Sequence, residues 1–317
     1  MTSVLILLTL PEAVRKEYQE GIKARFPGLT VNLVDHHTKV GPYIESADVL
    51  VSFGPMMADH VVREAVNLKW ILALGTGVDG IIDQPSLREG VMITNMHGVH
   101  GDSMSEAAIM LLLALSRGLA RSVRSQQQRR WDRFPASLLK DKTVGIFGVG
   151  AIAESLAPKC KAFDMTVVGI TSARREVAGF DRMFLREELE QAVAALDYLV
   201  LLTPYSAATR GIVDAKILAA MKPSAYLINL ARGGVIDEEA LIRVLEQKKI
   251  AGAALDVFGT EPLPVAHPFW GMENVIVTPH QGGFHDRYAA MAMPFIEENM
   301  RRFLAGDRRN MINVVRA

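Results

Sequence analysis

The fold of this chain is constrained most strongly by two series of short apolar runs. In each series the apolar runs alternate with longer amphipathic stretches. In the first series we predict helices at Pro11–Arg25 and Met57–Val66, and strands at Val4–Leu8, Val31–Val34, Val49–Phe53, Trp70–Leu74 and Val91–Thr94. Alternation of this kind is typical of a parallel sheet flanked by helices. A chain of 317 residues has room for about two such domains.

The second series starts near Thr143. Its predicted strands are Thr143–Phe147, Thr166–Ile170, Tyr198–Leu202, Ala225–Leu230, Gly252–Asp256 and Val275–Thr278, and its predicted helices are Ala151–Phe163, Leu185–Ala195, Asp214–Ala220 and Glu238–Lys248. Between the two series, Ser103–Leu119 predicts a long buried helix, and the polar segment Arg121–Pro135 predicts a boundary. The predicted fold class is α/β, with two Rossmann-like domains that have parallel sheets and a cleft between them. Open sheets of this kind bind ligands beyond the carboxyl ends of their strands, so we expect the functional site there.

Charge and cysteine content narrow the function. Lys and Arg total 35 and Asp and Glu total 35, so the net charge of +0 does not favour nucleic acid or an anionic membrane as a partner. The one cysteine, Cys160, excludes an internal disulfide and a thiolate metal site, and we expect no metal and a cytoplasmic location. The run Val4 to Leu10 lacks a preceding basic segment, and Ala107 to Leu115 is too short to span a bilayer, so we expect neither a signal peptide nor a membrane helix.

The stretch "GVGAIA" joins a predicted strand to a predicted helix. Gly148 allows the tight turn, Gly150 lets a pyrophosphate approach the helix N-terminus, and Ala153 is small enough for the third position of the pattern. The alternative is a turn with a purely structural role. The strand predicted before this turn and the helix predicted after it favour a dinucleotide site.

The end of the next predicted strand bears on the choice of dinucleotide. Thr171 stands where an acid would bind the ribose of NAD, and Ser172, Arg174 and Arg175 follow it. A serine and two guanidinium groups suit a ribose that carries a phosphate, so we predict NADPH, with NADH possible. The alternative for the two arginines is that they are solvated loop charges.

Three residues that suit hydride-transfer chemistry follow later strands. Arg232 ends one strand and has two glycines behind it, Glu261 lies in the loop after Asp256, and His280 ends another strand. An arginine holds a carboxylate in a fork, a histidine exchanges a proton near neutral pH, and a glutamate orients the histidine and favours its charged form. A structural ion pair with a neighbouring carboxylate is the alternative for Arg232.

Over nearly its whole length the chain resembles the D-isomer-specific 2-hydroxyacid dehydrogenases, in "GIFGVGAIA", "LINLARGGVIDEEAL", "ALDVFGTEPLP" and "VIVTPHQGG". The resemblance implies that Arg232 binds the substrate carboxylate and carbonyl and that Glu261 partners the acid/base His280. It also implies that the loop "LALGTGVDGI" binds the carboxylate through Thr76 and Gly77. The expected cofactor contacts are Gly148, Val149, Gly150, Ala151, Ile152, Ser172, Arg174, Arg175, Thr203, Pro204, Thr209, Ala231 and Asp256.

The resemblance also implies a domain plan and an activity. A discontinuous substrate domain is expected over 1–97 and 286–317, a dinucleotide-binding domain over 98–285, and a homodimer supported by the helix near Ser103–Leu119. We expect reduction of a small 2-oxoacid, such as glyoxylate or hydroxypyruvate, to the D-2-hydroxyacid. A cofactor-sensing binding protein like the family's corepressors is the alternative. Without an added C-terminal regulatory domain, an allosteric phosphoglycerate dehydrogenase is less expected, and Gln281 departs from the family pattern beside the histidine.

Overall fold

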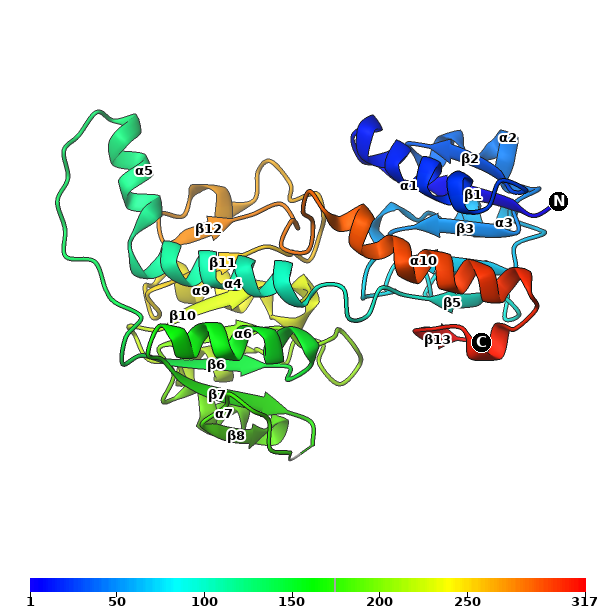
Figure 1. The fold of residues 1–317 in the computed structure, drawn as a ribbon. Coiled ribbons are helices and arrows are strands. Elements are labelled where there is room, and N and C mark those ends of the chain that lie inside the picture. The colour runs from blue at the N-terminus through cyan, green and yellow to red at the C-terminus, as the bar shows by residue number, and fades with distance from the viewer. Residues whose placement is uncertain (174) are drawn as a thin grey trace. The chain divides into compact units, whose positions relative to one another are not determined.

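The computed structural model describes residues 1–173 and 175–317. The chain divides into two compact units, the first made of Met1–His100 and Asp286–Ala317 and the second of Gly101–His285. Each unit has one sheet with helices on both of its faces, which confirms the predicted α/β class (Figure 1).

The sheet of the first unit has the strand order β13-β5-β4-β3-β1-β2. Its strands are β1 (Ser3–Leu7), β2 (Thr30–Val34), β3 (Val49–Ser52), β4 (Trp70–Ala73), β5 (Met92–Thr94) and β13 (Val314–Arg316). The first five strands pair in parallel, as the apolar runs predicted. The unpredicted strand β13 joins the edge antiparallel to β5, so this sheet is mixed at one edge.

Helices cover both faces of this first sheet. One face packs against α1 (Glu12–Arg25) and α10 (Tyr288–Leu304), and its core includes Trp70 and Tyr18, which are at most 1% exposed. The other face packs against the short helices α2 (Gly41–Ile44) and α3 (Asp59–Glu64). The period of the apolar residues in α1 and α10 accounts for one buried side on each helix.

The sheet of the second unit is fully parallel, with the order β12-β11-β10-β9-β6-β7-β8. Its strands are β6 (Thr143–Phe147), β7 (Thr166–Thr171), β8 (Arg182–Leu185), β9 (Tyr198–Leu201), β10 (Tyr226–Asn229), β11 (Gly252–Leu255) and β12 (Val275–Val277). The direction of strand progression reverses between β6 and β9. Open α/β sheets bind ligands beyond the strand ends at such a reversal.

Two layers of helices enclose this second sheet. One layer holds α4 (Gly101–Ser116) and α6 (Ala151–Ala162), and the other holds α7 (Leu189–Val193), α8 (Ala215–Ala220) and α9 (Glu238–Glu246). The predicted helix Leu185–Ala195 is wrong in its first turns, because Leu185 ends β8 and a 3-10 turn at Arg186–Glu188 precedes α7.

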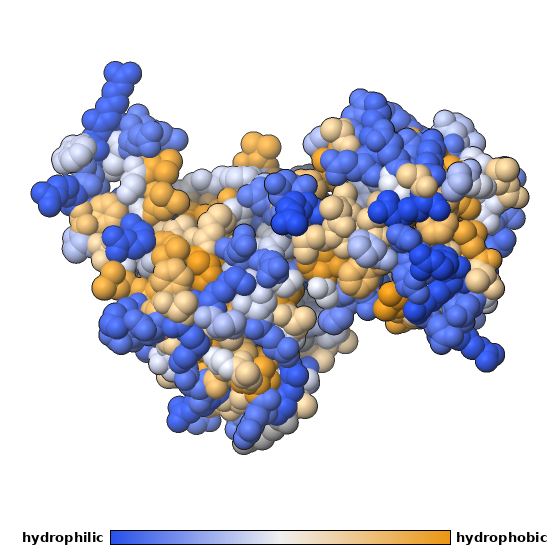
Figure 2. All heavy atoms as spheres, in the orientation of Figure 1, coloured by the Kyte–Doolittle hydropathy of each residue, from blue (hydrophilic) through white to orange (hydrophobic). Residues whose placement is uncertain are grey.

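The predicted boundary segment Arg121–Pro135 is partly helical, because α5 occupies Leu119–Gln127. Ser125 is its one buried residue, whereas Leu119 and Val123 are about half exposed. Figure 2 shows apolar side chains among polar ones over α4 and α5. In the described part of the chain no single helix is long and apolar enough to cross a membrane. Only α4 and α5 taken together have the length and composition of a membrane span, and the pair is bent by 65°.

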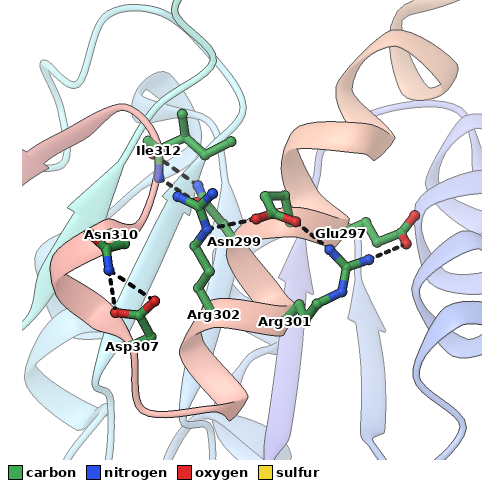
Figure 3. A network of polar contacts seen from close by, with 8 residues as sticks. Glu297, Asn299, Arg301, Arg302, Asp307, Asn310 and Ile312 are labelled. Atoms are coloured by element: carbon green, nitrogen blue, oxygen red, sulfur yellow. Dashed lines mark hydrogen bonds and ion pairs between the residues drawn. The ribbon is translucent and has the colours of Figure 1, made fainter.

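Side-chain hydrogen bonds attach the C-terminal segment to α10 (Figure 3). The amide of Asn299 donates to the carbonyl of Ile312 at 3.0 Å and accepts from its backbone N–H at 2.7 Å. Asn299 is 1% exposed, so these bonds lie away from water, where they are hard to replace. They hold the segment that leads into β13.

Candidate functional site

The glycine turn after β6 has the geometry that a bound pyrophosphate requires. Gly148 has φ +102°, and a Cβ there would lie 2.4 Å from the backbone N of Thr203, so only glycine fits. Gly150 caps the N-terminus of α6, and a Cβ on it would meet nothing within 4 Å. Ala153 is 1% exposed and takes the small-residue position against the sheet. No side chain caps the N-terminus of α6, and the space beside Gly150 is open, which fits an anionic ligand.

The remaining residues of this turn lie around the start of α6. Val149 is buried, Ile152 is half-buried and Ala151 is exposed. Their assignment as cofactor contacts stays a prediction.

The segment after β7 connects back to the same turn. Arg175 donates from Nη2 to the carbonyl of Val149 at 2.7 Å and pairs through the same nitrogen with Glu154 Oε1 at 2.9 Å. Ser172 is exposed, and Arg174 lies outside the described residues. One of the two predicted arginines is therefore attached to the glycine turn and is more than a solvated loop charge.

The loop after β9 packs behind the glycine turn. Thr203 is 7% exposed, and its backbone lies against Gly148. The hydroxyl of Thr209 donates to the carbonyl of Pro204 at 2.7 Å and accepts from the N–H of Ser206 at 2.8 Å. Thr209 therefore fixes the loop. The assignment of Thr203, Pro204 and Thr209 as cofactor contacts stays a prediction.

Arg232 follows β10 and is held by its neighbours. Its Nη1 donates to the carbonyl of Ala231 at 2.8 Å. Asn229, which is 1% exposed, donates to the carbonyl of Arg232 at 3.0 Å and accepts from the N–H of Ala231 at 3.0 Å. A Cβ on Gly233 would lie 1.9 Å from the carbonyl carbon of Phe258, so glycine is needed where this loop meets the loop after β11.

His280 and Glu261 are in direct contact. His280 Nδ1 and Glu261 Oε2 lie 2.6 Å apart, and the N–H of Phe258 donates to the other carboxylate oxygen at 3.0 Å. Burial raises the pKa of Glu261, but the hydrogen bond and charge of His280, the Phe258 amide and Arg232 outweigh it, so the pKa lies below its usual value. An ionised Glu261 can only accept, so it takes the hydrogen bond from His280 Nδ1 and orients the imidazole.

Asp256 holds the loop that carries His280. The Asp256 side chain is 2% exposed. Its carboxylate accepts hydrogen bonds from Thr278 Oγ1 at 2.5 Å, Gln281 N at 3.0 Å and Gly282 N at 2.9 Å. The N–H of His280 also donates to the backbone carbonyl of Asp256 at 2.8 Å. The sequence assigned Asp256 to the cofactor alone, and its role in shaping the histidine loop was missed.

In the first unit, Thr76 and Gly77 follow β4 in a glycine-rich turn. Thr76 Oγ1 lies 2.9 Å from His100 Nδ1, and Asn95 donates to the Thr76 carbonyl at 2.6 Å. His100 Nε2 in turn lies 3.0 Å from the hydroxyl of Tyr288, which donates to the carbonyl of Leu74. Sequence reasoning missed this support, because no local pattern links Leu74–Thr76, Asn95–His100 and Tyr288.

Among the described residues, no group of three His, Cys, Asp or Glu side chains is positioned to hold a metal ion. The residues of the second unit that were predicted to act in catalysis are Arg232, Glu261 and His280. These three residues follow neighbouring strands β10, β11 and β12 at their carboxyl ends.

Comparison with known proteins agrees with this arrangement. Residues 109–282 match the family model described as "D-isomer specific 2-hydroxyacid dehydrogenase, NAD binding domain". The chain is 35% identical to a glyoxylate/hydroxypyruvate reductase A of Serratia proteamaculans, over 71% of this chain and 74% of that protein. It is 34% identical to a D-3-phosphoglycerate dehydrogenase of Methanocaldococcus jannaschii, over 86% of this chain but only 52% of that protein.

A solved structure shares the fold. It is an NADPH-dependent glyoxylate/hydroxypyruvate reductase from Sinorhizobium meliloti in complex with NADP and sulfate, with a TM-score of 0.84, 27% identity, and coverage of 99% of this chain and 98% of that one. The family match spans the glycine turn and reaches beyond His280, and the relatives are similar over most of the chain. These findings show that the chain belongs to the D-isomer specific 2-hydroxyacid dehydrogenase family.

Proposed function

We propose that this protein reduces a small 2-oxoacid, with glyoxylate and hydroxypyruvate as first candidates, to the D-2-hydroxyacid, with NADPH as the preferred cofactor. The observation that carries the proposal is the contact of 2.6 Å between His280 and Glu261. These residues follow β12 and β11, and β11 lies next to β10, which Arg232 follows. The glyoxylate/hydroxypyruvate reductases among the relatives support the substrate class.

Each proposed catalytic residue has one task. Arg232 binds the substrate carboxylate, because its planar guanidinium matches the two oxygens of that group. His280 donates from Nδ1 to Glu261, and the imidazolium form gives its Nε2 proton to the carbonyl oxygen as the alcohol forms. Glu261 holds the orientation of His280. Thr76 and Gly77 bind the carboxylate through the anion-binding turn of the first unit.

The proposed cofactor site begins at the glycine turn. A bound nicotinamide dinucleotide supplies the hydride that the carbonyl carbon accepts. Gly148 allows the tight turn, and Gly150 leaves room for its pyrophosphate at the start of α6. Thr171 carries no charge that would repel a 2′-phosphate, and Ser172 and Arg175 offer donors, which favours NADPH over NADH.

The assembly and the compartment are also proposals. Exposed Met110, Leu119 and Val123 give α4 and α5 an apolar surface that suits a homodimer (Figure 2). A single buried thiol at Cys160 suits the reducing cytoplasm. The relatives reported above are enzymes, so the cofactor-sensing alternative is not favoured.

A substrate panel tests the activity. Glyoxylate, hydroxypyruvate, pyruvate and phenylpyruvate are each supplied with NADPH or NADH, and loss of the reduced nicotinamide absorbance is followed. Oxidation of D-3-phosphoglycerate is measured beside them, because one relative carries that name. We expect turnover of glyoxylate and hydroxypyruvate, faster with NADPH, and D-lactate rather than L-lactate from pyruvate. No turnover of any 2-oxoacid would refute the proposed function.

A further inference from the structure

The guanidinium of Arg175 is already engaged by a carboxylate at the glycine turn. One nitrogen, Nη2, lies 2.7 Å from the carbonyl of Val149 and 2.9 Å from Glu154 Oε1. The Arg175 and Glu154 side chains are each 47% exposed. The ion pair therefore links the segment after β7 to the first turn of α6, at the surface of the unit.

The location of Glu154 sets it against an anionic ligand. Gly150 is the N-cap of α6, and the N–H of Glu154 donates to its carbonyl at 2.9 Å. A phosphate that binds the Arg175 guanidinium comes within a few ångströms of the carboxylate that now holds it. The two anions repel each other, and they compete for the same cation.

We infer that Glu154 weakens the binding of NADPH by competing with its 2′-phosphate for Arg175. This inference rests on the proposed binding of a dinucleotide. NADH has a hydroxyl in place of the phosphate and neither needs the guanidinium nor meets the repulsion. Glu154 therefore lowers the affinity for NADPH and leaves the affinity for NADH unchanged. The preference for NADPH over NADH becomes smaller as a result.

The contact with Val149 explains how Arg175 remains available. An arginine has five N–H donors in one plane. Nη2 can keep its bond to the Val149 carbonyl while the other nitrogens turn toward a phosphate, so loss of the Glu154 pair does not release the side chain from the turn.

The test is a double-mutant cycle on Glu154→Gln and Arg175→Ala, with the dissociation constants of NADPH and NADH measured by nicotinamide fluorescence. Glu154→Gln should tighten NADPH by about threefold to fivefold, the upper part of the range for an exposed ion pair, and leave NADH within about twofold. With Arg175→Ala in place, the same change should alter NADPH binding by less than about twofold.

Glu273→Gln is the matched control. Glu273 is an exposed glutamate whose partner, Arg124, lies 4.0 Å away, and it precedes β12, so the variant removes the same charge from the opposite end of the parallel strands. It should leave both cofactors unchanged. Weaker NADPH binding by Glu154→Gln would overturn the inference, because it would mean that Glu154 orients Arg175 for the phosphate. An equal gain in affinity for NADH would also overturn it. So would an equal gain in affinity for NADPH when Arg175 is replaced by alanine.

The same data separate this inference from the proposed function. If the wild type binds neither cofactor, the proposed function fails and the inference fails with it. If both cofactors bind and Glu154→Gln changes nothing, the inference alone is refuted.

Discussion

Replacement of Asp256 by asparagine should loosen the loop that carries His280. The carboxylate accepts from Thr278 Oγ1, Gln281 N and Gly282 N, and it is 2% exposed. Asparagine retains one oxygen, and its NH₂ group, in place of Oδ2, faces the N–H of Gly282. The hydrogen bond from Gly282 N is lost, and that N–H is left without a partner. The hydrogen bonds from Thr278 Oγ1 and Gln281 N remain, but their acceptor is no longer charged.

The magnitude follows from those bonds. A hydrogen bond to a charged group contributes about 1.5–3 kcal/mol, and a buried unpaired donor carries its own cost. We expect Asp256→Asn to lower the free energy of unfolding by about 2–4 kcal/mol. For a unit of this size the melting temperature should fall by about 5–15 °C. A shift of His280 by about 1 Å should lower kcat for 2-oxoacid reduction by about 100-fold.

Thermal unfolding and steady-state kinetics measure the two effects on one sample. Asp237→Asn is the control, because Asp237 accepts from the N–H of Ala240 at 3.0 Å at the N-cap of α9, where asparagine serves as well as aspartate. The control should unfold and react like the wild type. An Asp256→Asn protein that melts within about 1 °C of the wild type and keeps its kcat would refute the assigned role.

Three further predictions concern single side chains. Because the pKa of Glu261 is lowered, its carboxylate is ionised at neutral pH and accepts the hydrogen bond of His280. Glu261→Gln removes that charge and should move the decline of kcat/KM with rising pH to lower pH; an unchanged profile would contradict the pairing. Arg232→Lys should raise KM for the 2-oxoacid far more than the dissociation constant of NADPH, because a point charge cannot replace the fork, and equal effects on both would count against it. Burial raises the pKa of Cys160 to about 12, so a disulfide reagent should leave the folded protein unmodified at pH 8 and titrate one thiol after unfolding in guanidinium.

Much of the fold was predictable because buried strands and amphipathic helices leave a periodic apolar signal. The strands β6 and β9 are apolar along their whole length, and the prediction found both. The edge strands β8 and β13 were missed because they are short and partly exposed, so their sequences carry no alternation. Helix α5 was missed because its polar sequence buries only Ser125.

The candidate site was predictable where chemistry and strand ends coincide. Arg232 and His280 are polar residues directly after apolar strands, a position that local sequence reveals. The residues that support them were not found, because their partners lie far along the chain. His100 contacts Thr76 and Tyr288, which are 24 and 188 residues away, and only the folded structure brings those segments together.

The central claim is that this protein reduces a 2-oxoacid with His280 as the proton donor. The most direct test compares wild type and His280→Ala for glyoxylate-dependent oxidation of NADPH, with NADPH binding measured on the same proteins. We predict turnover by the wild type, a loss of about 10²–10⁴-fold in the variant, and equal dissociation constants for NADPH. A wild type without turnover, or a variant that keeps the wild-type rate, would contradict the account.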